Sequence, residues 1–127
     1  MPKHAESIAT IVARIDHKTL DFSVESLEWV DATLFAFHND GVQANDIAET
    51  LFRFGAYIGE VFIHNNAGAQ WVNAPESGPF AGGWPLVSLG TDQLVNPIGK
   101  AFKRVEHGVG EDLMYFYDVF AKPHKTT

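Results

Sequence analysis

Residues 45–66, with the sequence NDIAETLFRFGAYIGEVFIHNN, form the longest helical pattern in the chain. Apolar side chains recur along it at helical spacing, which predicts one wide buried face on a helix about 30 Å long. A helix of that length crosses a domain of 127 residues, so the other elements must pack against it. Asn65-Asn66-Ala67-Gly68 is a stop signal that ends it.

Gly55 and Gly59 lie inside this helical pattern. A glycine in a helix interior costs roughly 1 kcal/mol relative to alanine, so some other interaction must offset the loss. The simplest compensation is close approach of a neighbouring element to the helix backbone. We therefore expect a second, flat strip around these glycines, on which another helix or the sheet lies.

Other helices are predicted on both sides of this segment. Residues 4–16 form an amphipathic pattern, and Ser23 is a suitable N-cap for a helix that Gly41 ends. A hydrophobic staple between Phe22 and Leu27 fits the same start. Asn96-Pro97 and Glu111-Asp112 open two further helices, the first with Asn at the cap and Pro at the first helical position.

Short strands are expected between the helices. Residues 69–73, 86–89 and 93–95 have strand-like composition, and the second and third flank a turn that makes a hairpin. Residues 74–85 are rich in proline and glycine and predict an irregular loop. The expected fold is α+β, with about five helices packed on a small, mainly antiparallel three-stranded sheet in a single domain, 1–127.

Composition narrows the classes of function. Hydrophobic residues make up 46% of the chain and the formal net charge is −7, which fits a folded core and argues against binding to nucleic acid or to an anionic membrane. Cysteine is absent, so disulfides and thiolate metal sites are excluded. The N-terminus lacks the apolar region of a signal peptide, and no apolar run is long enough to span a bilayer. We expect a cytoplasmic protein.

Glu60 and His64 are the weak catalytic candidates. They lie four residues apart on the central helix, the spacing of acid–base pairs and of helical metal ligands. The alternative is an ordinary ion pair on a solvated helix face. A metal needs three or more ligands, and no second Glu/His pair is present, so the sequence predicts no metal site and no cofactor.

Two groups of residues are candidates for binding. Aromatic residues in and near the proline- and glycine-rich loop, Trp71, Phe80 and Trp84, can supply contact area for a partner or can instead fold back over the sheet. A basic stripe on the helix after Asn96 can attract phosphate, carboxylate or an acidic partner, or can pair with the protein's own acidic residues. Its residues are Lys100, Lys103, Arg104 and His107.

From Gly55 to Tyr117 the chain resembles a loosely defined group of small bacterial domains of unknown function. The resemblance rests on Gly55-Ala56-Tyr57-Ile58-Gly59-Glu60, on Gly68 and Trp71, on the hairpin, and on the helix start Asn96-Pro97-Ile98-Gly99-Lys100. The group brings no established activity for any residue. Some small acidic domains of this kind are partners of secreted toxins, which implies an immunity-type protein as one form of the function.

Three functions stay open on the sequence alone. The first, which we favour, is a non-enzymatic protein-binding module, either an immunity-type protein or an adaptor, and it requires exposed Phe80 and Trp84. The second is a small hydrolase or lyase in which Glu60 and His64 act as an acid–base pair facing a shared cavity. The third is a structural or self-associating protein that forms homo-oligomers.

Overall fold

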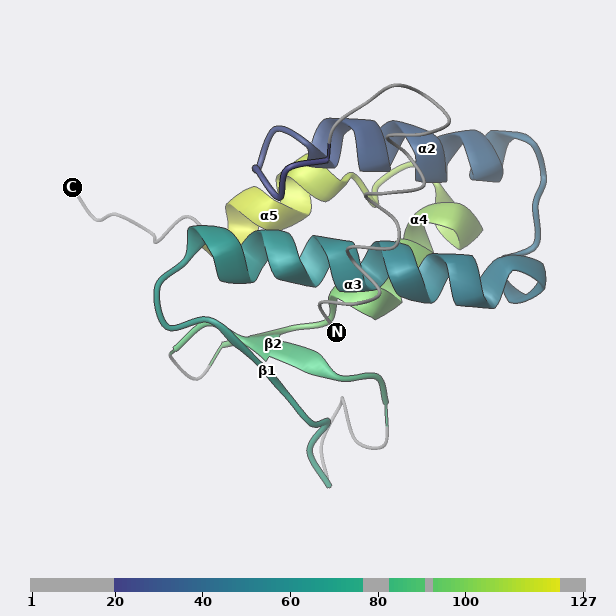
Figure 1. Cartoon of the computed structure of the whole chain (residues 1–127). Helices are drawn as coiled ribbons and strands as arrows, with labels where there is room; N and C mark the ends of the chain where they lie inside the picture. Colours follow the sequence, from purple (N-terminus) through teal and green to yellow (C-terminus); the bar gives the residue numbers. More distant parts are fainter. Residues whose placement is uncertain (1–19, 77–82, 91–92, 122–127) are drawn as a thin grey trace.

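The computed structural model describes residues 20–76, 83–90 and 93–121. The described residues form an α+β structure with four α-helices, one 3₁₀-helix and three strands (Figure 1). In chain order the elements are α2 (Leu27–Asn39), η1 (Ala44–Ile47), α3 (Ala48–Asn65), β1 (Gln70–Val72), β2 (Leu86–Ser88), β3 (Leu94–Val95), α4 (Pro97–His107) and α5 (Leu113–Ala121). None of these helices combines the length and the apolar character needed to cross a membrane.

Helix α3 is the central element, as the sequence predicts. Every residue from Phe54 to Phe62 is buried, so the middle of the helix is covered on all sides rather than on one face. In Figure 1 it lies between α2 and the strands β1 and β2, and α4 packs along it more extensively than any other element does. The predicted start at Asn45 is wrong by a few residues because 44–47 form the 3₁₀-helix η1.

The two glycines of α3 mark close contacts, which confirms the expected strip. A Cβ atom on Gly55 would overlap the backbone of Ile98 in α4, and one on Gly59 would overlap the indole ring of Trp71 in β1. Glycine therefore lets one helix and one strand approach the α3 backbone closely. This approach compensates for the low helix propensity of glycine.

The three strands form one antiparallel sheet in the order β1-β2-β3. Trp71 pairs with Val87, and Val87 pairs with Val95 on its other side. The predicted three-stranded antiparallel sheet and the β2–β3 hairpin are confirmed. Val87 and Val95 are buried and join the core formed by the helices, so the sheet is held by packing as well as by its short ladders.

Two predictions about helices need correction. Five helices do not match the four α-helices of the described residues, and the helix expected at 4–16 lies outside those residues. The helix predicted to start after Ser23 begins at Leu27, because residues 23–26 form a turn in which the Ser23 hydroxyl accepts a hydrogen bond from the Ser26 amide. Phe22 has a φ of 62° and stacks on Tyr57, and because α2 begins at Leu27, Phe22 and Leu27 do not hold the positions of a hydrophobic staple.

The other end signals are confirmed. Gly41 follows α2 with a φ of 74°, the left-handed conformation that a helix end often requires. The Asn96 side chain accepts a hydrogen bond from the Gly99 amide, and Pro97 is the first residue of α4. These caps need only residues close in sequence, which is why the pattern alone predicts them.

Candidate functional site

Glu60 is buried, with 5% of its surface exposed, so the expectation of a solvated face is wrong at this position. Its Oε2 accepts a hydrogen bond of 2.8 Å from the indole Nε1 of Trp71, and its Oε1 lies 3.4 Å from Nε2 of His64. Trp71 comes from β1 and covers the polar face of α3. Helical periodicity cannot show this cover, because it comes from a strand that follows the helix.

His64 continues the same face toward solvent. Its side chain is 49% exposed, and its ring stacks on Phe22 with the centroids 4.6 Å apart. The Tyr57 hydroxyl lies 2.7 Å from the Ser26 hydroxyl and accepts a hydrogen bond from the Phe22 amide. Burial raises the pKa of Tyr57, although the Ser26 hydroxyl opposes that shift. Through these contacts of Tyr57 and His64, the segment before α2 packs on α3.

The chemistry of the Glu60–His64 pair is restricted by these contacts. Each carboxylate oxygen already has a partner within the protein, Trp71 or His64. A general base needs an oxygen within hydrogen-bond reach of a substrate proton, and the burial of Glu60 restricts the access of a substrate to either oxygen. No group of three His, Asp or Glu side chains in the described ranges is arranged to hold a metal ion.

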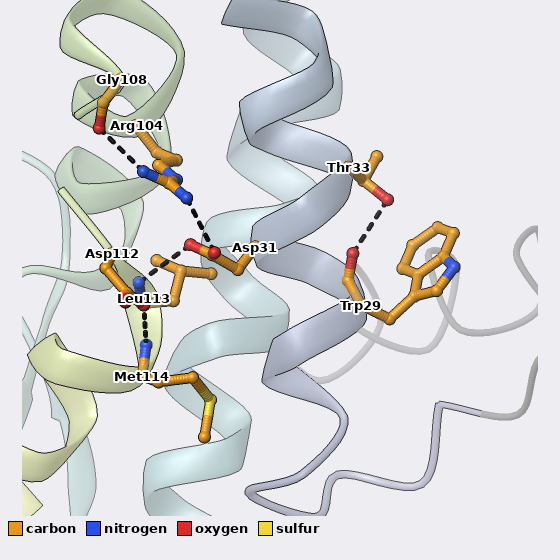
Figure 2. A network of polar contacts seen from close by, with 8 residues as sticks. All are labelled: Trp29, Asp31, Thr33, Arg104, Gly108, Asp112, Leu113 and Met114. Carbon is orange, nitrogen blue, oxygen red and sulfur yellow. Dashed lines mark hydrogen bonds and ion pairs between the residues drawn. The ribbon is translucent and has the colours of Figure 1, made fainter.

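The basic stripe of α4 divides into buried and exposed residues. Arg104 is 8% exposed and donates hydrogen bonds of 2.8 Å to Asp31 of α2 and to the carbonyl of Gly108 (Figure 2). The second oxygen of Asp31 accepts from the Leu113 amide at the start of α5. Arg104 therefore joins α2, α4 and the start of α5, and its predicted role in binding a partner needs correction, since it is not at the surface.

Lys100 also has a partner inside the protein. Its Nζ donates a hydrogen bond of 2.7 Å to Glu111 and lies 5.2 Å from the ring centroid of Phe116. The hydrogen bond from Lys100 lowers the pKa of Glu111. Lys103 and His107 are exposed, so they are the members of the stripe that face solvent.

The aromatic candidates also divide. Trp84 is 41% exposed, and its ring stacks on Phe102 at a centroid distance of 5.6 Å and contacts Phe52 at 5.7 Å. We call Trp84, Phe52 and Phe102 the aromatic cluster. Trp71 is partly buried against Gly59, so it is not an exposed loop residue, and Phe80 lies outside the described residues.

Phe52 and Phe102 are cluster residues that the sequence does not single out. Phe52 belongs to α3 and Phe102 to α4, and both are half-buried. Each lies beside the apolar stripe of its own helix, where periodicity alone indicates core. The sequence feature that they share is an aromatic residue at the margin of such a stripe. The packing of α4 along α3 brings both rings to Trp84.

Comparison with protein-family models, with curated proteins and with solved structures finds no match for this chain. The resemblance to small bacterial domains therefore stays a prediction. The function has to be argued from the geometry of the residues themselves.

Proposed function

We propose that this protein is a non-enzymatic protein-binding module and that its aromatic cluster is the centre of the partner surface. The observation that carries the proposal is the exposure of Trp84, 41% of its surface, while its ring rests on Phe52 and Phe102. Tryptophan is among the residues that contribute most to protein interfaces. Because Trp84 is already exposed, a partner can contact its indole without any change in the fold.

The packing of the cluster supports binding at low entropic cost. The rings of Trp84 and Phe102 are inclined by only 21°, and both Phe52 and Phe102 are fixed on helices. A side chain that is already ordered loses little freedom when a partner arrives, whereas ordering a mobile one costs about 0.5–1.5 kcal/mol. The exposed part of the indole then supplies apolar area that a partner removes from water.

Charge favours a particular class of partner. The formal net charge of −7 produces a negative field that attracts a basic protein over a distance of about one Debye length, near 8–10 Å at ordinary ionic strength. An immunity-type protein that binds a basic toxin, or an adaptor with a basic client, fits this field. The acid–base alternative has weaker support because Glu60 is buried, with 5% of its surface exposed, and Trp71 covers it.

The experiment is capture of partners from the native cell with the full chain as bait. Co-purifying proteins are identified and the best one is then titrated against wild type, Trp84→Ala and Tyr115→Ala. We expect Trp84→Ala to weaken binding by about 2 kcal/mol or more, as an interface hot spot does. Tyr115 is the matched control, because it is a 70% exposed aromatic on α5, which contributes nothing to the cluster.

Thermal unfolding of each variant shows whether the fold is kept. Equal binding of wild type and Trp84→Ala would contradict the proposal for this surface. An equal loss in Tyr115→Ala would show that the effect is not specific to the cluster. Turnover of a small substrate that disappears in Glu60→Gln while the variant stays folded would favour the enzymatic alternative.

A further inference from the structure

A surface pocket of about 260 Å³ lies between β3, the start of α4 and α5. It is separate from the aromatic cluster, since it contains none of the cluster residues. Its apolar lining consists of Leu94, Val95, Phe116 and Phe120. Its polar lining consists of Asn96, Lys100, Lys103 and Glu111. An apolar wall with a few polar groups is the usual composition of a small-molecule site.

The charges on the polar lining do not cancel. Lys100 and Glu111 neutralise each other through their 2.7 Å contact. Lys103 forms no ion pair with the residues that the structure describes, so the pocket keeps one positive charge on a protein of net charge −7. The Asn96 carboxamide oxygen accepts from the Gly99 amide, which leaves its NH₂ group as a hydrogen-bond donor.

We propose that this pocket binds a small organic carboxylate that carries an apolar chain. The carboxylate pairs with Lys103 and accepts a hydrogen bond from Asn96, while the chain lies against Phe116 and Phe120. The assignment follows from the coexistence of an aromatic wall and an excess positive charge, two lysines against one glutamate, in one pocket. It does not depend on the protein-binding function proposed above.

The volume limits the size of the ligand. A volume of about 260 Å³ lies just below the range of about 300–1,000 Å³ that is usual for small-molecule sites, so the ligand has to be small. A chain of about eight carbons ending in a carboxylate matches this space. A nucleotide is too large and too polar for an apolar wall, and an amine of the same length would meet the charge of Lys103.

The test uses the full chain, sodium octanoate as the probe and octylamine as its opposite-charge control. Binding is followed at neutral pH by the backbone amide shifts of residues around the pocket, up to about 10 mM ligand, where affinities in the millimolar range are still measurable. We expect octanoate to shift the amides of Lys103, Phe116 and Phe120 with saturation. Octylamine should not shift them.

Lys103→Gln and Val109→Glu form a matched pair of variants, because each lowers the net charge by one. Val109 is 83% exposed and does not line the pocket. We expect Lys103→Gln to weaken octanoate binding by about tenfold, the loss of one charge-assisted contact, and Val109→Glu to leave it close to wild type. Phe120→Ala should weaken octanoate binding too, while Tyr115→Ala should not.

Four results would overturn the proposal. One is octylamine binding as tightly as octanoate. Another is the absence of saturable shifts at the pocket, and the third is equal weakening in Lys103→Gln and Val109→Glu. Shifts confined to the Trp84 indole would show binding at the aromatic cluster instead, which also overturns this assignment and leaves the protein-binding proposal to its own test.

Discussion

The Glu60 carboxylate ties strand β1 to helix α3 through a single hydrogen bond from the Trp71 indole. Burying a carboxylate without partners costs several kcal/mol, so its contacts with Trp71 and His64 have to compensate. The result is a polar contact in the same place where Gly59 allows the indole to lie on the helix. Gly59 therefore makes room for Trp71, and Glu60 binds the same side chain by a hydrogen bond.

The Lys100–Glu111 pair gives a prediction about pH. The pKa of Glu111 is lowered from the ordinary value of 4.5, first of all by its hydrogen bond to Lys100. As the pH falls, the unfolded chain therefore takes up a proton at this position before the folded chain does. The stability that the pair contributes is present above the unfolded pKa and is lost as the pH falls through the folded pKa.

We expect Glu111→Gln to be less stable than wild type at neutral pH by about 1 kcal/mol or less, and to lose less stability between about pH 5 and pH 3. Urea unfolding at a series of pH values measures both effects. Glu49→Gln is the control. Glu49 is the i,i+4 partner of Arg53, and the Glu49 side chain is 79% exposed. Parallel pH curves for wild type and Glu111→Gln would contradict the prediction.

At single positions, the sequence predicts which residues of one helix lie together, but not what covers them. Glu60 and His64 do meet, as a spacing of four requires, whereas the exposure of Trp84 is one of two outcomes that the sequence leaves open. The burial of Glu60 and of Arg104 could not be predicted, because Trp71 and Asp31 come from other elements. Long-range packing decides whether a charged helix face is solvated or covered.

At the level of elements, α3 gives a prediction through its glycines. On an open helix surface, Gly→Ala stabilises by about 0.5–1 kcal/mol. Here we expect the opposite sign, because the added methyl group overlaps Ile98 at Gly55 and Trp71 at Gly59. Overpacking of this kind costs about 1–3 kcal/mol.

Chemical denaturation of Gly55→Ala and Gly59→Ala measures these costs. Gly55→Ala should be the more damaging variant, since its obstacle is a backbone atom of α4, while the Trp71 side chain can shift. Ala36→Gly, at an exposed position of α2, calibrates helix propensity in this protein. A gain in stability in either glycine variant would show that close approach is not what the glycines provide.

The boundary of a helix can be predicted from the sequence when residues close to it in the chain determine it. The end of α2 at Gly41 and the start of α4 at Asn96 are set by neighbouring residues, and both are predicted correctly. The start of α2 is not, because Phe22 is held by Tyr57 and Asn65 of α3. A Ser at 23 is compatible with a helix start, but a tertiary contact selects a turn there.

For the molecule as a whole, charge argues against self-association. Each copy carries a net charge of −7, so two copies repel each other. We expect a sedimentation coefficient that does not change with concentration.

Sedimentation velocity measures this coefficient at protein concentrations from about 1 to 100 μM. This range detects dimers of micromolar and weaker affinity. Trp84→Ala should sediment like wild type. A dimer that forms in wild type and disappears in Trp84→Ala would assign the cluster to self-association, and the proposed role in binding another protein would then lose its main support.

The fold class could be predicted at this scale because hydrophobic periodicity changes along the chain from helix to strand and back. The α+β class and the antiparallel sheet follow from it. The arrangement of α2 against α4 and α5 does not, since it depends on contacts such as Asp31 with Arg104 (Figure 2). No local pattern encodes that pairing.

The reach of Asp31 has a consequence for synthesis. Its second oxygen accepts a hydrogen bond from an amide 82 residues further along the chain. At about 5–20 residues per second, the ribosome needs roughly 4–16 seconds to make that stretch. Within this interval the ribosome completes α2 and α3 before it completes the α4 and α5 surfaces that cover them, so the apolar surface of the nascent chain is left to interact with chaperones and other chains.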